Sequence, residues 1–115
     1  MASTIPLNTF KTVASAITTA DVDIYTAPVG ITTIILMAQV CNMNTATPLD
    51  KWVSAAHNDG STMRYLVKQF GVPSNDSVSV LTGKLVLESG QSITMSAETD
   101  SYLEVVLSIL ETSNE

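Results

Sequence analysis

The stretch Gly83–Glu98, GKLVLESGQSITMSAE, decides the fold class of this chain. Two short apolar runs flank the turn residues Glu-Ser-Gly at positions 88–90. The second run alternates strictly, with Ile93, Met95 and Ala97 on one side and Ser92, Thr94 and Ser96 on the other. Successive side chains of a β-strand point to opposite faces, so this alternation is typical of a strand with one buried face. The stretch therefore predicts two strands joined by a turn.

The same two-residue period recurs along the chain, and no helical stripe of apolar residues stands out. Met63–Phe70 is the one segment that also allows a helical reading, but it is short for a helix. With turn signals roughly every 8–12 residues, the pattern predicts about eight strands in an all-β, antiparallel β-sandwich or jelly-roll-like fold. The strand candidates are Phe10–Ile17, Val22–Thr26, Ile31–Asn42, Trp52–Ala56, Thr62–Phe70, Val78–Val80, Leu85–Leu87, Ile93–Ala97 and Tyr102–Leu110.

The chain has 115 residues, which suits a single domain that carries its own core. Residues 1–8 lack periodicity and contain Pro6, so we expect an extended N-terminal arm there, with a disordered tail as the alternative. The β-sandwich domain is expected over residues 9–111. Residues 112–115 are expected to form a frayed C-terminal tail.

The candidate strand Ile31–Asn42 is the longest and is apolar on both faces. Such a strand is either central in one packed domain, which we take as the first interpretation, or covered on its outer face by another subunit. Strict alternation places Met37, Gln39 and Cys41 on one face, and Ile34, Leu36 and Val40 on the other. Cys41 is expected to be a buried, inert thiol, and Met37 and Met95 are expected to fill the core.

Charge excludes several classes of partner. The formal net charge is -6, from 5 basic and 11 acidic residues, and the basic residues are scattered. Binding to a nucleic-acid backbone or to an anionic membrane needs clustered Lys and Arg, so neither partner is expected. The N-terminus does not resemble a signal peptide, and the longest apolar stretch, Ile34–Cys41, is too short to span a bilayer. We expect a protein that stays in the cytosol where it is made.

Catalytic and cofactor chemistry is not expected. The only histidine, His57, falls in a predicted hairpin turn over residues 57–60, and no serine lies in a Gly-x-Ser-x-Gly motif. The single cysteine excludes an intrachain disulfide and a zinc motif. Asp21 and Asp23, with Glu98 and Asp100, are the weak candidates for a calcium site, against the default reading of solvated surface carboxylates. We therefore expect no enzyme, no cofactor and no metal.

Four motifs in a fixed order carry a resemblance over residues 20–110. They are IYTAPVG at Ile24–Gly30, ITTIILMAQVCNMN at Ile31–Asn44, PSNDS at Pro73–Ser77 and LVLESGQSI at Leu85–Ile93, followed by a closing alternating strand. This layout resembles the small β-sandwich virion proteins of tailed bacteriophages, which are head-decoration (cement) proteins or small tail-associated subunits. Trp52 and the first twenty residues lie outside the resemblance.

The resemblance implies a non-enzymatic virion structural protein that is assembled in the host cytoplasm. As a decoration protein it would bind capsid subunits and associate with itself, as a trimer on threefold lattice points. The alternatives are a tail, baseplate or fibre-adaptor subunit and, more remotely, a calcium-dependent carbohydrate-binding module. The residues expected at interfaces are Ile5, Pro6 and Leu7 of the arm, Ile34, Leu36 and Val40 of the long strand, and Trp52.

Overall fold

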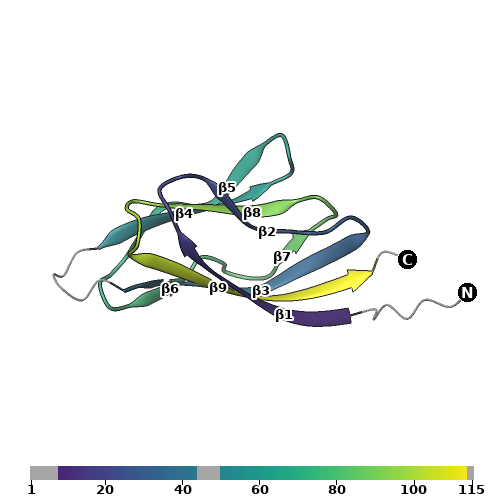
Figure 1. Ribbon diagram of the computed structural model, residues 1–115, viewed down its shortest axis with the longest axis horizontal. Helices are drawn as coiled ribbons and strands as arrows, with labels where there is room; N and C mark the ends of the chain where they lie inside the picture. The colour runs from purple at the N-terminus through teal and green to yellow at the C-terminus, as the bar shows by residue number, and fades with distance from the viewer. Residues whose placement is uncertain (1–7, 44–49, 114–115) are drawn as a thin grey trace, which may run out of the picture.

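A computed structural model describes residues 8–43 and 50–113, and over these residues the chain is all-β (Figure 1). It forms nine strands, one at each of the nine strand candidates, where the turn spacing indicates about eight, and they pair only in antiparallel fashion. The strands are β1 (Asn8–Ile17), β2 (Val22–Thr26), β3 (Ile31–Asn42), β4 (Lys51–Asn58), β5 (Met63–Val72), β6 (Ser77–Ser79), β7 (Leu85–Leu87), β8 (Ser92–Ala97) and β9 (Leu103–Ser113).

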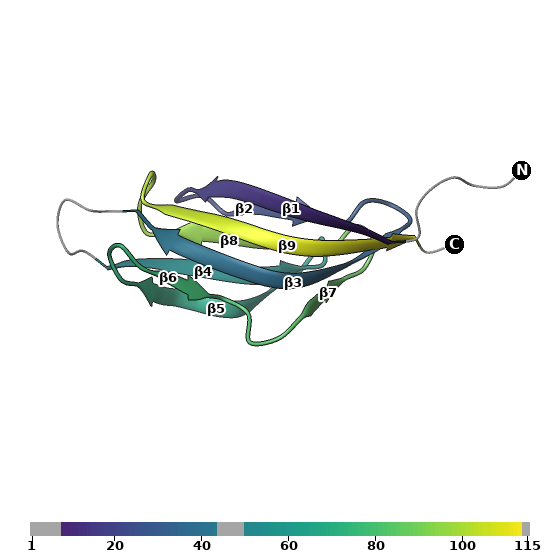
Figure 2. The same cartoon turned by 90° about the horizontal axis from the view of Figure 1, so that it is seen from below.

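The strands form two sheets that pack face to face. Sheet A has the order β1-β9-β3-β6, with β7 also paired to β3, and sheet B has the order β2-β8-β4-β5. In Figure 2, β9 and β3 of sheet A cross in front of β8 of sheet B. This arrangement confirms the predicted antiparallel β-sandwich.

The core lies between the two sheets and follows the predicted alternation. In β9, Leu103, Val105, Leu107 and Ile109 all point inward and are almost fully buried, as are Ile93, Met95 and Ala97 of β8. The polar side chains on the outer face of β8 are also buried, because β8 is a central strand and its short side chains bond to those of β2. Thr94 Oγ1 donates to Asp23 Oδ1 over 2.6 Å, and the hydroxyls of Ser92 and Thr26 lie 2.7 Å apart.

A β-bulge in β3 corrects the predicted faces of that strand. The register with β9 shifts between Ile35 and Met37, so that one extra residue is inserted and the inward positions change parity. Thr33 and Ile35 point inward before the bulge, and Ala38 and Val40 point inward after it. The prediction that Cys41 is buried was therefore wrong, because the shift leaves its thiol exposed. Met95 fills the core as expected, whereas Met37 is only partly buried.

Several boundaries also differ from the predictions. His57 lies in β4 and not in a turn, because the β4–β5 hairpin bends at residues 59–62, beyond Asn58. β5 is paired with β4 along its length, so the helical reading of Met63–Phe70 was wrong. β9 continues to Ser113, paired with β1 and β3, so residues 112 and 113 are not a frayed tail. Residues 1–7, most of the predicted loop at 44–50, and residues 114–115 lie outside the described residues.

Two predicted turns form where glycine supplies an unusual backbone angle. Gly30 closes the turn after Pro28 with a φ of 81°, and Gly90 closes the turn after Ser89 with a φ of 85°. A positive φ of this size is cheap for glycine and strained for other residues. The two turns are bonded to each other, since Gly90 N donates to Ala27 O over 2.9 Å and Gly30 N donates to Ser89 Oγ over 3.1 Å.

Candidate interaction surface

The outer face of sheet A carries a row of apolar side chains that crosses four of its five strands at one level. Phe10 of β1 lies opposite Leu110 of β9, Leu110 lies opposite Ile34 of β3, and Ile34 lies opposite Val86 of β7. Phe10 is 73% exposed and Val86 is 51% exposed, and Leu110 and Ile34 between them are partly buried. We name these four residues the apolar row. Three strand spacings make it about 14 Å wide.

The bulge in β3 widens this apolar surface. Both Leu36 and Met37 are partly exposed, because the extra residue places them together opposite Ser108 of β9. Leu36 lines a shallow hollow beside Phe10 and Thr12 of β1. Beyond the bulge, Val106 of β9 is 40% exposed on the same face. Contiguous exposed apolar area on a small domain is typical of a surface that another molecule covers.

A cluster of polar side chains joins the two sheets one residue along from the apolar row, and Lys11, which is half exposed, closes it toward solvent. Tyr25 of β2 donates a hydrogen bond from its hydroxyl to Glu111 Oε2 of β9, over 2.5 Å. The same hydroxyl lies 2.8 Å from Thr33 Oγ1, and Lys11 Nζ of β1 lies 2.9 Å from Glu111 Oε1. The cluster joins sheet B to three strands of sheet A. It therefore holds the sheet beneath the apolar row in place.

The charges of this cluster are set by their contacts. The hydrogen bond from Tyr25 holds the pKa of Glu111 below its ordinary value against the opposing effect of burial, and Lys11 lowers that pKa further. Burial, with the nearby Glu111 carboxylate, raises the pKa of Tyr25 to about 12. At neutral pH the cluster therefore contains a neutral phenol, a carboxylate and an ammonium group. These groups satisfy one another, which is what a structural tie requires.

The residues expected at interfaces fall in different places. Ile34 belongs to the apolar row and Leu36 lies beside it, so sheet A brings these two together. Val40 is fully buried in the core, because the bulge turns it inward, and it is not part of any surface. Trp52 is partly buried at the other end of the molecule, in sheet B. Ile5, Pro6 and Leu7 lie outside the described residues.

Three members of the apolar row are not among the interface residues predicted from the sequence. Phe10, Val86 and Leu110 each occur in a predicted strand, but single-sequence alternation does not show which strands are neighbours. The signal that unites them is the pairing register, which is known only once the strands are assembled.

His57 and three of the four candidate calcium ligands are bonded to other groups, and the fourth, Asp21, lies exposed just before β2. His57 Nε2 lies 3.0 Å from Gln91 Oε1, with no acid or nucleophile joined to it by a hydrogen bond in the part of the chain that the structure describes. Asp23 accepts from Thr94, Asp100 Oδ1 accepts from Thr19 N over 2.9 Å, and Glu98 Oε1 accepts from Trp52 N over 3.2 Å. Within residues 8–43 and 50–113, no three His, Cys, Asp or Glu side chains gather in a way that would hold a metal ion.

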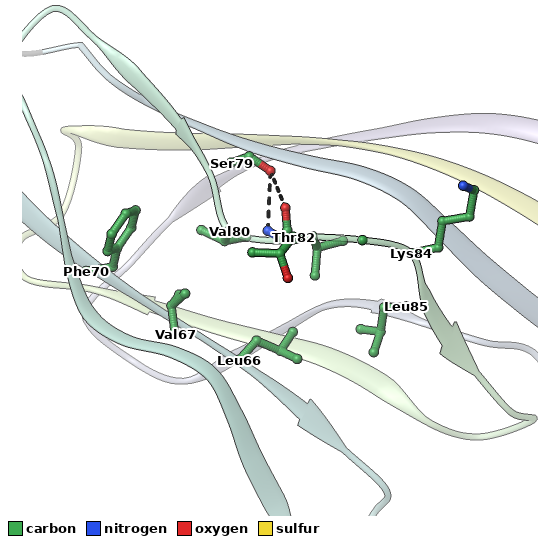
Figure 3. Close-up of a pocket in the computed structure, with 10 residues that line it drawn as sticks. Leu66, Val67, Phe70, Ser79, Val80, Thr82, Lys84 and Leu85 are labelled. Atoms are coloured by element: carbon green, nitrogen blue, oxygen red, sulfur yellow. Dashed lines mark hydrogen bonds between the residues drawn. The ribbon is translucent and has the colours of Figure 1, made fainter.

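A groove of about 300 Å³ opens on the other side of the sandwich, between β5 and the segment that joins β6 to β7 (Figure 3). Leu66, Val67 and Phe70 form one wall, and residues 79–85 form the other. Ser79 Oγ bonds to the backbone of Leu81 and so shapes that second wall. Lys84 is the only titratable group among its lining residues, so the groove does not present the convergent polar groups of a small-molecule site.

Among the described residues, no helix is long and apolar enough to cross a membrane.

Comparisons with known proteins give a fold and no family. No family model matches the chain, and no curated protein matches it. Among solved structures, the chain is similar to a chain of the acidic stable capsid of Helicobacter pylori bacteriophage KHP30. The TM-score is 0.58 at 11% identity, covering 96% of this chain and 90% of that one. At such low identity the likeness shows a shared fold only.

A second likeness is slighter. A pentameric capsid protein isolated from metagenomic phage sequences has a TM-score of 0.43 at 14% identity, covering 88% of this chain and 60% of that one. This likeness is too small to carry an argument.

Proposed function

We propose that this chain is a non-enzymatic structural subunit of a phage virion and that it decorates the capsid, docking through the outer face of sheet A. The observation that carries the proposal is the apolar row Phe10–Leu110–Ile34–Val86. It lies on a rigid sandwich whose fold is shared with a chain of a phage capsid. The order of the sequence motifs, which resembles that of small phage virion proteins, points the same way.

The mechanism is stabilisation by mass action. A subunit that binds the assembled shell and not the free capsid protein shifts the equilibrium toward the shell, by an amount that grows with concentration. A pre-formed surface favours docking, because each side chain that becomes ordered on binding loses conformational entropy and so weakens the affinity. The Tyr25–Glu111 cluster provides that rigidity, since it fixes sheet A to sheet B beside the apolar row.

The N-terminal residues add a second contact in this proposal. The segment Ile5–Leu7 directly precedes β1, which begins at Asn8 and contributes Phe10 to the apolar row. An arm that adds an extended strand to a neighbouring subunit would bind through backbone hydrogen bonds and apolar side chains. Removing residues 1–7 is expected to weaken shell binding without lowering the melting temperature of the sandwich. Unchanged affinity of the truncated chain would remove the arm from the account.

The experiment that tests the proposed role is quantitative mass spectrometry of purified virions from the phage whose genome encodes this chain. A decoration protein is expected in copy numbers comparable with those of the major capsid protein. A low copy number set by the symmetry of the tail would replace the decoration role with a tail, baseplate or fibre-adaptor role. Absence of the chain from the particles would reject the proposed function.

Self-association is also part of the proposal. The resemblance to cement proteins implies a trimer, which no described contact tests, whereas the strand edges considered below favour a dimer. The molar mass of the purified chain in solution measures the oligomeric state directly, since one chain has a mass of 12.2 kDa.

A further inference from the structure

The four edges of the two sheets are not equally protected against pairing with another chain. β6 and β7 expose only three residues each. β2 has five residues, and its register shifts between Asp23 and Tyr25. β5 is longer, but its pairing with β4 shifts twice, and Gln69 in it has a φ of 51°. Short strands and bulges are the devices by which soluble proteins blunt free edges.

β1 has none of these devices. It pairs with β9 through ten consecutive residues without a register shift, and it is the outermost strand of sheet A in the described structure (Figure 2). In an antiparallel ladder, about half of the backbone N–H and C=O groups of an edge strand point away from its only neighbour. Asn8–Ile17 contains no proline, no acidic residue and one basic residue, Lys11. A long, regular and almost uncharged edge of this kind is a template for another strand.

The side-chain sizes along β1 identify a second copy of the same strand as the partner. The first half contains the larger residues Phe10, Lys11 and Thr12, and the second half contains Ala14, Ser15 and Ala16. Antiparallel pairing of two copies in a register centred on Val13 sets each larger residue against a smaller one. Phe10 then lies opposite Ala16, Lys11 opposite Ser15, and Thr12 opposite Ala14 of the second copy.

The distribution of charged residues also favours the β1 edge as the place where two copies pair. Each chain has a net charge of -6, so two copies repel each other at most surfaces. β1 has no carboxylate, whereas the β2 edge has Asp21 beside it and Asp23 within it. Lys11 does not meet its own copy in this register, so no like charges are placed opposite each other. Pairing along β1 therefore brings the two chains together at an edge strand that carries no carboxylate.

We propose that two copies of this chain pair antiparallel along the free edge of β1, in the register centred on Val13, to form one continuous sheet. The role of this pairing rests on the proposed function. A twofold axis perpendicular to sheet A leaves the apolar rows of the two copies on the same side, so that both can contact one surface. Two linked faces bind one surface more tightly than a single face, because the second contact forms at a high effective concentration. The pairing itself is measured on the purified chain without any shell.

The test is analytical ultracentrifugation of the chain and two variants over a concentration series. Ala14→Lys adds a charge at the centre of the pairing, on an exposed side chain, and Thr82→Lys adds the same charge on the exposed segment at the opposite edge of the sheet. We expect the wild type and Thr82→Lys to reach twice the mass of one chain, and Ala14→Lys to weaken association by at least ~10-fold. Circular dichroism checks that all three melt as β-proteins at similar temperatures.

The register is tested by disulfide formation between two differently labelled chains, both in a Cys41→Ser background. A chain with Thr12→Cys mixed with a chain with Ala14→Cys is expected to form a mixed disulfide on mild oxidation, because the two positions lie directly opposite each other. The control mixture pairs Thr12→Cys with Ala20→Cys, an exposed position beyond the end of β1, and is expected to stay unlinked.

A monomer at all concentrations, a trimer mass, or a dimer indifferent to Ala14→Lys would each overturn the pairing. None of these results bears on the copy number of the chain in virions, so failure of the pairing and failure of the proposed function are distinguishable.

Discussion

The hydroxyl of Tyr25 in β2 donates a hydrogen bond to the carboxylate of Glu111 in β9, across the interior of the sandwich. These two residues belong to different sheets and lie 86 positions apart in the chain. Glu111 is only 9% exposed, and its second oxygen is bound by Lys11. At this end of the molecule, beside the apolar row, a hydrogen-bonded polar pair therefore takes the place of apolar core packing. The rigidity of this end depends on the charge of Glu111.

This relationship predicts a pH dependence of stability. The folded-state pKa of Glu111 is lowered from 4.5, so the stabilisation is complete above that value and is lost as the pH falls through the lowered pKa. The folded-state pKa of Tyr25 is raised from 10.0 to about 12, so stability also falls as the pH rises through that interval. Thermal melts from pH 2 to pH 12 measure both losses.

Glu111→Gln isolates the acid part of this dependence. At neutral pH we expect the variant to be less stable by about 1–3 kcal/mol, because Lys11 and Tyr25 lose a charged partner. The gap between wild type and variant should narrow as the pH falls, since the wild-type carboxylate is then neutral too. Glu104→Gln, on the exposed face of the same strand, is the matched control. A gap that stays constant with pH would contradict the charge-based account.

The alternation of β9 predicts that substitutions at two adjacent residues lower stability by very different amounts. Leu107 is fully buried in the core, and Val106 is 40% exposed on the outer face. Leu107→Ala should lower the free energy of unfolding by about 2–5 kcal/mol, because it removes buried methyl groups and leaves a cavity. Val106→Ala should cost less than about 1 kcal/mol. Urea denaturation measures both, and similar losses at the two positions would show that the faces of β9 are assigned wrongly.

The register shift in β3 predicts a reactive thiol. Cys41 is exposed because the bulge places it on the outer face of sheet A. A thiol reagent such as Ellman's reagent should therefore modify one cysteine per chain in the folded protein, at a rate close to that of the urea-unfolded chain. If the folded thiol reacted orders of magnitude more slowly than the thiol of the unfolded chain, Cys41 would be buried, as strict alternation along this strand predicts.

The turn at Gly90 predicts a cost that has a purely backbone origin. Its φ of 85° is unfavourable for any residue with a Cβ, although no other atom lies within 4 Å of where that Cβ would be. Gly90→Ala should lower stability by about 1 kcal/mol. Gly83→Ala is the control, because Gly83 also has open space around it but no positive φ. Equal effects of the two substitutions on the melting temperature would contradict this reading of the turn.

The fold was predictable from sequence because it rests on local signals. The alternation in Ile93–Ala97 and Leu103–Ile109 marks the inward faces correctly, and Gly30 and Gly90 lie in the turns that the sequence indicated. The bulge in β3 was not predictable, because Ile34, Ile35 and Leu36 are interchangeable in hydrophobicity and do not mark where a residue is inserted. That one insertion reversed the assignments of Val40 and Cys41.

The candidate surface was predictable only in part. Ile34 and Leu36 were identified from the two-faced strand, but Phe10 and Val86 join them only through pairing between segments that are distant in the chain. The Tyr25–Glu111 bond is equally non-local. Single-sequence patterns describe which way a side chain points within its strand, and not which strand lies beside it.

Docking of sheet A onto the shell is the central step of the proposed role. The measurement is co-sedimentation of the purified chain with shells of the encoding phage that lack this protein, using wild type, Phe10→Ser and Val29→Ser. Phe10 and Val29 are both highly exposed, but Val29 lies in the turn between β2 and β3 and outside the apolar row. We predict saturable binding of the wild type and Val29→Ser, and little binding of Phe10→Ser at an unchanged melting temperature. Equal binding of all three proteins, or binding by none, would contradict the account.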